Sequence, residues 1–175
     1  MKTPVKLIWT YEGDFRSDMY RPMAMIRVRA STNRHGKISQ LVYRNVSASI
    51  TLQRGYTDPS NPEDPGALSG AVVLPYCIPN KQIEVVALQP CNEPLGCWRS
   101  VGESCNAFAV DSAVDELALA RALDPMALRK TASSGTNGNP RMLAVLKAVE
   151  MLSNRAPPPA SGHARGAAMR SGFGG

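Results

Sequence analysis

The chain has 175 residues, a net charge of +6 and a hydrophobic fraction of 43%. This length supports one domain with a hydrophobic core, and the 14 glycines and 14 prolines predict many loops. No apolar run approaches the ~18 residues that a membrane helix needs, so we expect no membrane span. The short apolar stretch near the N-terminus runs into charged residues, so we expect no export signal and, by default, a cytoplasmic location.

The positive charge is concentrated in residues 126–175, where one acidic residue, Glu150, accompanies seven basic ones. The basic residues are Arg129, Lys130, Arg141, Lys147, Arg155, Arg165 and Arg170. Such a tail can attract nucleic acid or anionic lipid, but these charges are widely spaced and accompany no motif of a nucleic-acid-binding module. We therefore expect a solvated basic surface, or part of an incomplete domain, and no nucleic-acid partner. The alternative is a small polyanion-binding protein that uses its basic C-terminal third.

The four cysteines, Cys77, Cys91, Cys97 and Cys105, contain no CxxC pair, and neither histidine lies at zinc-ligand spacing from them. We therefore expect no metal ligands and four reduced thiols that are partly buried as small hydrophobic groups. A further alternative is a thiol enzyme with Cys97 as its nucleophile. That reaction needs a neighbouring base, and the sequence places none beside Cys97.

In chain order, alternating apolar residues first predict strands at 4–10, 23–31 and 37–51. A turn at 33–36 joins the last two into a hairpin with one apolar face. Met23, Met25, Arg27 and Arg29 lie on one side of the first hairpin strand, and Ala24, Ile26, Val28 and Ala30 lie on the other. Residues 54–70, rich in proline and glycine, predict a long loop, and residues 82–89 predict another strand.

Three helices are expected in the second half of the chain. Helical spacing predicts the first over 106–122, capped by Ser104 or Asn106, with Asp111 on its polar face. Asp124 and Pro125 begin a second helix, and Pro140 begins a third. The fold class is therefore α+β, with an antiparallel strand group followed by a three-helix segment. Residues 1–90 form mainly strands, 91–104 a loop, 105–154 the helices, and 155–175 a linker and the start of a strand.

Residues 94–102, here called the glycine loop, have the sequence PLGCWRSVG and precede the predicted first helix. Glycine lets backbone amides approach a ligand closely, and arginine supplies a fixed fork of hydrogen-bond donors. The start of a helix adds the positive end of its dipole. This combination predicts a loop that contacts an anionic or oxo ligand, whereas an ordinary strand-to-helix turn is the alternative.

Several segments carry a resemblance to a known family when they are taken in order along the chain. They are PVKLIWT with EGDF, MYRPMAMIRVRA, YCIPN, PLGCWRSVGESCNAFAVDSAVDELALA, LDPMALR, and GHARGAAM with FG. In this order they resemble the large, molybdenum-binding subunit of the molybdenum hydroxylases, the family of xanthine dehydrogenase and aldehyde oxidoreductase. The similarity is greatest to the isoquinoline 1-oxidoreductase beta-subunit type.

The resemblance implies an oxidoreductase that hydroxylates aldehydes or N-heterocycles with oxygen from water, with electrons leaving through an iron–sulfur small subunit. It implies that Gly96, Cys97, Trp98, Arg99 and Ser100 line the site of a molybdopterin-type molybdenum cofactor. Arg99 would orient or stabilise charge there, and Trp98 would form a wall of the pocket. The alternatives are a salt-bridged surface arginine and an ordinary core tryptophan. The match at 165–167 implies the start of a strand near the cofactor.

Two motifs of that family are missing from these residues. The base in the family is a glutamate in a Gly-x-Gly-Glu setting, and neither this motif nor the preceding Gly-Gly-x-Phe-Gly segment occurs here. We therefore assign no catalytic residue and expect an internal fragment, a partial molybdopterin-binding domain that is inactive alone and exposes apolar surface. An export signal on the longer parent protein would make that enzyme periplasmic. Glu103 directly follows the glycine loop, but it matches a variable polar position, so we expect a surface glutamate.

Overall fold

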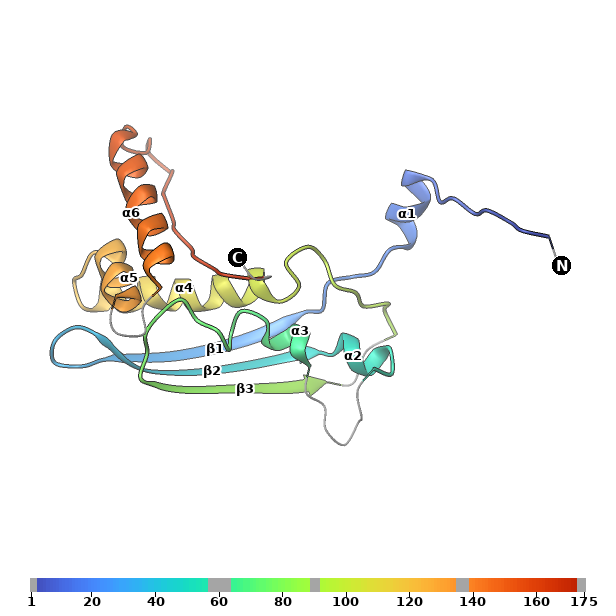
Figure 1. The fold of residues 1–175 in the computed structure, drawn as a ribbon, viewed down its shortest axis with the longest axis horizontal. Helices are drawn as coiled ribbons and strands as arrows, with labels where there is room; N and C mark the ends of the chain where they lie inside the picture. Colours follow the sequence, from blue (N-terminus) through green and yellow to red (C-terminus); the bar gives the residue numbers. More distant parts are fainter. Residues whose placement is uncertain (1–2, 57–63, 89–91, 135–138, 173–175) are drawn as a thin grey trace.

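The structure is a computed structural model that describes residues 3–56, 64–88, 92–134 and 139–172. Its elements in chain order are α1 (Tyr11–Ser17), β1 (Ala24–Thr32), β2 (Ile38–Ala48), α2 (Ile50–Gln53), α3 (Pro65–Leu68), β3 (Asn80–Leu88), α4 (Glu103–Ala120), α5 (Pro125–Ser133) and α6 (Pro140–Arg155). Figure 1 shows the sheet with α4 along it and α5 and α6 at one end. The predicted α+β class is confirmed.

The hairpin of β1 and β2 forms as predicted from its alternating pattern. The two strands are antiparallel, with Ile26 opposite Asn45 and Val28 opposite Tyr43 on the face toward α4. The Asn33 side chain accepts hydrogen bonds from two amides of the turn, and Gly36 adopts a left-handed φ of 74°. A turn of this kind favours glycine because other residues pay a steric cost there.

The third strand differs from the predicted antiparallel group, because β3 lies parallel to β2. A parallel neighbour requires a long crossover connection, and the chain between β2 and β3 supplies one. The predicted strand at 4–10 is wrong: these residues are exposed and form no ladder. A strand is stable only when a neighbour satisfies its backbone groups, and none of the described strands lies beside this segment.

The predicted loop at 54–70 is interrupted by secondary structure at its end, where α3 begins. The Asp64 carboxylate accepts hydrogen bonds from the amides of Gly66 and Ala67, and Pro65 occupies the first helical position. These two residues are a standard helix start, and the composition of the whole loop obscured that local signal. Residues 57–63 of this loop lie outside the described part of the chain.

Helix α4 begins earlier than predicted, and neither Ser104 nor Asn106 caps it. Its N-cap is Gly102, which makes no side-chain capping bond. Asn106 is instead fully buried, where its amide donates to the carbonyls of Ala67 and Ser69, and its Oδ1 accepts from the Tyr43 hydroxyl. This side chain therefore joins the sheet, the α3 turn and α4.

The starts of α5 and α6 are confirmed. Asp124 accepts a hydrogen bond from the Ala127 amide, and Asn139 accepts from the amides of Arg141 and Met142. In both helices proline follows the cap. Capping depends only on neighbouring residues, which explains why the sequence was sufficient here.

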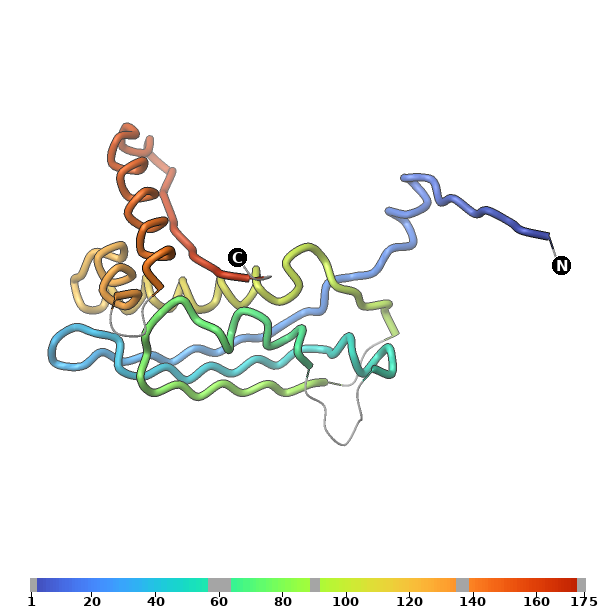
Figure 2. The backbone as a smooth tube through the Cα atoms, in the orientation of Figure 1, coloured from blue at the N-terminus to red at the C-terminus, as the bar shows by residue number. Residues whose placement is uncertain are grey.

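The core lies between the sheet and the helices. Its buried side chains are Ile38, Leu41 and Tyr43 of β2, Val110, Val114 and Ala118 of α4, Leu128 and Ala132 of α5, Met142 and Leu146 of α6, with Ala71, Tyr76, Ile78 and Met169 from connecting segments. Figure 2 shows residues after α6 returning along that helix toward α4. Residues 164–172 form no strand, so the implied strand start at 165–167 is not observed. None of the described helices is long and apolar enough to cross a membrane.

Candidate functional site

The glycine loop lies beside residues 19–21, which precede β1. The Tyr20 amide donates to the Pro94 carbonyl at 2.8 Å, and the Gly96 amide donates to the Tyr20 carbonyl at 3.0 Å. These two bonds form an isolated parallel bridge between Tyr20 and Leu95. Segments that are 75 positions apart in the sequence (20 and 95) therefore form one unit.

The two glycines of the loop are explained by contacts within the chain. A Cβ on Gly96 would lie 2.7 Å from the Cβ of Met19, and one on Gly102 would lie 2.2 Å from the Gly66 carbonyl oxygen. Both distances are far below normal van der Waals contact, so only glycine fits at either position. The glycines therefore bring the loop close to its own scaffold, and the surface that can face a ligand lies between them.

Arg21 holds the loop in its conformation. Its Nη1 donates to the Val101 carbonyl at 2.5 Å, and its Nη2 donates to the Arg99 carbonyl at 3.0 Å. The same guanidinium lies 6.0 Å from the centre of the Trp98 ring, within range of a cation–π interaction. Ser100 and Val101 have left-handed φ values of 77° and 50°, which cost about 1–2 kcal/mol for each residue with a Cβ. The bonds from Arg21 offset part of this strain.

The sequence did not identify Arg21 as a site residue. It lies in the matched segment MYRPMAMIRVRA, but nothing in its local pattern distinguishes it from other surface arginines. Its partners are backbone carbonyls 78 and 80 residues away, so only the folded structure reveals its role.

The middle of the loop presents free donors to solvent. Cys97, Trp98 and Arg99 are exposed, and within the described residues no acceptor binds the amides of residues 97–100 or the Arg99 guanidinium. The Trp98 indole donates to the Met19 carbonyl at 2.9 Å while 56% of the residue stays exposed. Trp98 is therefore not a core tryptophan, and Arg99 forms no ion pair with any of the described residues.

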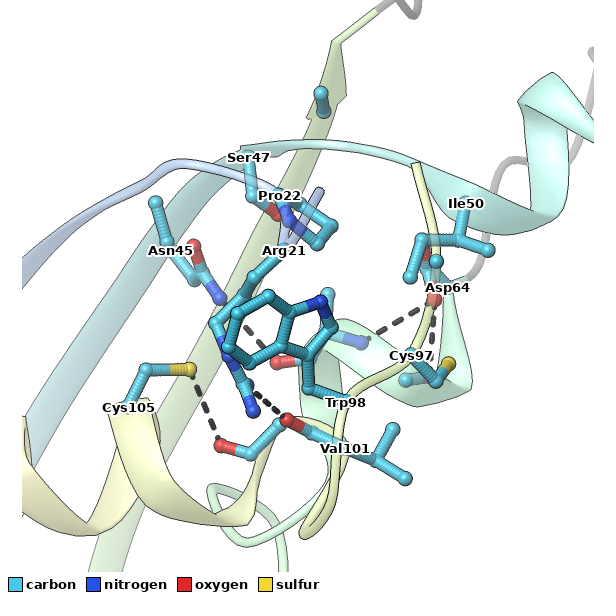
Figure 3. Close-up of a pocket in the computed structure, with 16 residues that line it drawn as sticks. Arg21, Pro22, Asn45, Ser47, Ile50, Asp64, Cys97, Trp98, Val101 and Cys105 are labelled. Atoms are coloured by element: carbon cyan, nitrogen blue, oxygen red, sulfur yellow. Dashed lines mark hydrogen bonds between the residues drawn. The ribbon is translucent and has the colours of Figure 1, made fainter. Parts of the chain in front are cut away.

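A cavity of about 50 Å³ lies behind the loop, and Figure 3 shows the side chains around it. Arg21, Asn45, Cys97, Trp98 and Cys105 are among its lining residues. The Oδ1 atom of Asn45 is buried there without a hydrogen-bond partner. A space of this size holds a few water molecules and is much too small for a pterin. No histidine lines it, so the structure provides no imidazole base for the thiol-enzyme alternative at Cys97.

Glu103 is not the surface glutamate expected from its variable position. Only 16% of its side chain is exposed, and its carboxylate accepts a hydrogen bond from the Ser69 hydroxyl at 2.9 Å. Arg170 lies 3.8 Å from the same carboxylate, and Gly70 and Gly172 pack against it. The first residue of α4 therefore connects the end of the glycine loop to the C-terminal segment.

Asp111, predicted on the polar face of α4, is also buried. It accepts hydrogen bonds from the Tyr76 hydroxyl, from Nε of Arg129 at 3.2 Å and from the Met169 amide at 3.3 Å. Burial and then the Asp111 charge raise the pKa of Tyr76 far above its usual range. Burial lowers the pKa of Arg129, but Asp115, Tyr76 and Asp111 more than reverse this effect, so the guanidinium stays charged.

The basic residues of the last third do not form one surface. Arg129 is buried against Asp111 and Asp115, and Lys130 pairs with Glu150 at 2.6 Å. Arg165 donates to backbone carbonyls near the end of α6, and Arg170 lies beside Glu103. Four of the seven basic residues are thus engaged within the chain, and the structure gives no support to the polyanion-binding alternative. In the described part of the chain no group of histidine, cysteine or carboxylate side chains is placed to hold a metal ion.

Residues 1–132 match the molybdopterin cofactor-binding domain, and the chain belongs to this family. It is similar to isoquinoline 1-oxidoreductase subunit beta of Brevundimonas diminuta, with 29% identity over 154 residues, 86% of this chain and 19% of that subunit.

Two solved structures show the same fold. Quinoline 2-oxidoreductase from Pseudomonas putida aligns with a TM-score of 0.60 and 14% identity, over 84% of this chain and 20% of its own. The aldehyde oxidoreductase from Desulfovibrio desulfuricans aligns with a TM-score of 0.54 and 20% identity, over 77% of this chain and 16% of its own. The chain thus spans about a fifth of the length of the relatives it matches.

Proposed function

We propose that this chain supplies one cofactor-contacting loop to an oxidoreductase that hydroxylates aldehydes or N-heterocycles with oxygen from water. The reaction needs the other segments that the longer relatives contain, and the isolated chain is inactive. The observation that carries the proposal is the row of unpaired backbone amides at residues 97–100, which Arg21 and Trp98 hold in one conformation.

The residues present fit an anionic, oxo-rich group. Backbone amides that point at such a group need no reorganisation when they bind it, and Arg99 adds a guanidinium with a fixed fork of hydrogen-bond donors. Trp98 provides an apolar wall beside these donors. When bound, the molybdenum cofactor supplies the redox and oxygen-transfer chemistry. This chain's own residues bind it, orient it and limit access of water to one side of it.

Two of the described carboxylates near the loop already have partners within the chain. Asp64 is committed to the α3 cap and to the Ser49 hydroxyl, and Glu103 is committed to Ser69 and Arg170. In this proposal the base, the iron–sulfur small subunit and the residues that select a substrate come from outside this chain. This assignment agrees with the lack of a Gly-x-Gly-Glu segment in the sequence.

The test is to produce the chain in a host that makes the cofactor, both alone and in place of the matching segment of isoquinoline 1-oxidoreductase subunit beta. We expect no bound molybdenum or pterin on the isolated chain, and both on the chimaera. In the chimaera, Arg99→Ala should lower molybdenum occupancy and slow turnover by about 10²–10³-fold, as for loss of one charge-stabilising donor.

The matched control is Arg121→Ala, because Arg121 is also exposed but lies at the far end of α4. A chimaera that folds without retaining molybdenum would refute the proposal. So would an Arg99→Ala chimaera that keeps full occupancy and turnover.

A further inference from the structure

The carboxylate of Glu103 lies in a closed niche at the junction between the glycine loop and α4. Only 16% of its side chain is exposed, and the Ser69 hydroxyl donates to it at 2.9 Å. A Cβ on Gly70 would lie 2.2 Å from its Oε2 atom, and one on Gly172 would lie 3.4 Å from its Oε1 atom. Two backbone segments that are distant in sequence therefore enclose this side chain.

Arg170 is the cation that faces this carboxylate, from the C-terminal segment that Figure 2 shows returning from α6 toward α4. Its Nε atom lies 3.8 Å from Oε2 of Glu103, and 12% of its side chain is exposed. Among the described residues, no acceptor binds its guanidinium nitrogens and no donor binds Oε2 of Glu103. Burial lowers the pKa of Arg170, and the charges of Asp111 and Glu103 act in the opposite direction. Attraction between charges, rather than a fixed hydrogen-bond geometry, therefore holds the two side chains together.

The backbone of Glu103 transmits this attachment to the glycine loop. Its amide donates to the Ser100 carbonyl at 2.8 Å, and Ser100 is one of the two loop residues with a left-handed φ. Gly102, the N-cap of α4, makes no side-chain capping bond, so the junction lacks the bond that usually fixes a helix start. The place of Glu103 in its niche therefore determines where the Ser100 carbonyl lies.

Rigid peptide planes extend this effect to the free donors of the loop. The Ser100 carbonyl shares a peptide plane with the Val101 amide, which donates to the Trp98 carbonyl at 2.9 Å. The Trp98 carbonyl in turn shares a plane with the Arg99 amide, and that amide has no acceptor within the described residues. Hydrogen bonds and planar peptide units therefore connect Glu103 to an unpaired donor of the candidate site.

We propose that Glu103 and Arg170 are positioning residues for the glycine loop, because their ion pair fixes the first turn of α4 and thereby the direction of the Arg99 amide. Arg21 acts on the same loop through the carbonyls of Arg99 and Val101, so two distant segments hold it. Glu103 and Arg170 themselves do not touch the ligand. This role rests on the proposed function, since the loop is the one that contacts the cofactor in that proposal.

The test follows Trp98 in the full chain with Trp9→Phe, which leaves one tryptophan. Arg170→Met removes the charge and keeps an unbranched side chain. A buried carboxylate that loses its cation is strongly destabilised, so Glu103 should leave its niche in this variant. We expect the Trp98 emission of the folded chain to move to longer wavelength and to be quenched more easily by acrylamide.

Arg170→Lys is the conservative variant, since it keeps the positive charge and removes the guanidinium fork. The ion pair in the structure uses no hydrogen bond to the guanidinium, so the charge alone should be sufficient. We therefore expect Arg170→Lys to keep the Trp98 emission and quenching of the original chain.

Glu103→Gln tests the other member of the pair, because glutamine has a similar shape and can still accept a hydrogen bond from the Ser69 hydroxyl. It leaves the Arg170 guanidinium without this carboxylate, so the Trp98 emission should move in the same direction as in Arg170→Met. Glu103→Gln combined with Arg170→Met removes both charges. We expect the combined variant to shift the emission by less than the sum of the two single shifts, which indicates direct coupling.

Lys130→Met is the matched control. Lys130 of α5 forms an ion pair with Glu150 of α6 at 2.6 Å, and their side chains are 29% and 28% exposed. Helix α5 follows the far end of α4, so loss of this pair should lower the midpoint of urea denaturation and leave the Trp98 emission of the folded chain unchanged. The comparison separates a general loss of stability from a change in the loop.

Two results would overturn the proposal. One is that Arg170→Met and Glu103→Gln fold and keep the Trp98 emission and quenching of the original chain. The other is that Arg170→Lys shifts the emission as much as Arg170→Met, which would mean that the shape of the side chain matters and its charge does not.

If the single neutral variants do not fold, the remaining two decide the question. The proposal then requires the original emission from Arg170→Lys and a shifted emission from the combined variant of Glu103 and Arg170, and any other pair of spectra overturns it. None of these measurements needs the cofactor, so they can fail while the chimaera test of the proposed function succeeds, and the reverse.

Discussion

At the scale of single residues, the most informative side chain is Arg21. It binds two carbonyls of the glycine loop and lies against Trp98, at a point where Ser100 and Val101 adopt left-handed φ values. A hydrogen bond from a charged donor contributes about 1.5–3 kcal/mol, similar to the strain of two such residues. The loop conformation therefore depends on this arginine, and its loss should release the loop.

Arg21→Ala should lower the free energy of unfolding by about 1.5–3 kcal/mol and expose Trp98 further to water. In a Trp9→Phe background, where Trp98 is the remaining tryptophan, the emission should shift to longer wavelength and become easier to quench. Arg121→Ala provides the comparison, since Arg121 is exposed at the end of α4. An unchanged emission spectrum in Arg21→Ala would mean that the Trp98 bond to Met19 suffices to hold the loop.

At the scale of elements, the sequence predicted well the features that depend on neighbouring residues. It did not predict the features that depend on long-range contacts. The hairpin, its turn and the starts of α5 and α6 depend on residues close in sequence, and the sequence predicted all of them. The direction of β3, the burial of Asp111 and the partners of Glu103 depend on residues far apart along the chain. No pattern within α4 distinguishes a carboxylate that faces solvent from one that faces Arg129.

The same reasoning applies to the candidate site. The sequence located the glycine loop, and the structure places Cys97, Trp98 and Arg99 on its exposed surface with Gly96 buried behind them. The sequence could not predict that the close approach of Met19 and Gly66 leaves room only for glycine at positions 96 and 102, because those neighbours come from other parts of the chain. The contact of these residues with a cofactor remains a prediction.

The contacts of Asp111 join α4 to α5, to the segment before β3 and to the C-terminal segment. Asp111→Ala would remove the fully buried carboxylate that pairs with the buried Arg129 guanidinium, so we expect a loss of about 3–5 kcal/mol in unfolding free energy. Asp115 binds the same guanidinium but is 42% exposed, so Asp115→Ala should cost about 1 kcal/mol or less. Equal denaturation midpoints for the two variants would contradict this ranking.

At the scale of the whole molecule, the fold combines a tightly held centre with a large uncovered surface. The sheet and helices α4, α5 and α6 enclose a continuous core. Tyr43, Tyr76, Asn106 and Asp111 form a buried polar layer within it. Residues 3–18 carry exposed apolar side chains, and the side of the sheet away from the core combines the exposed Met25 with the exposed Arg27 and Arg44. Exposed apolar surface was expected for part of a larger protein, and large exposed apolar side chains lie on residues 3–18 and also on α4 and α6.

The buried tyrosines give the whole molecule a defined response to alkaline pH. Burial is the main cause that raises the pKa of both Tyr43 and Tyr76 well above the ordinary value of 10.0. Because the folded-state pKa lies above that of the unfolded chain, their stabilising effect is complete below pH ~10 and declines as pH rises above it. Each tyrosine adds up to about 1.4 kcal/mol per pH unit to this decline.

We therefore expect the free energy of unfolding, measured by urea denaturation, to fall between pH ~10 and ~12. Tyr76→Phe should be less stable at pH 8, because Asp111 loses a hydrogen bond, but its further loss above pH ~10 should be smaller. Tyr56→Phe should reproduce the original slope, since Tyr56 is 73% exposed. If Tyr76→Phe and the original chain lost stability in parallel above pH ~10, the decline in unfolding free energy would come from groups other than Tyr76.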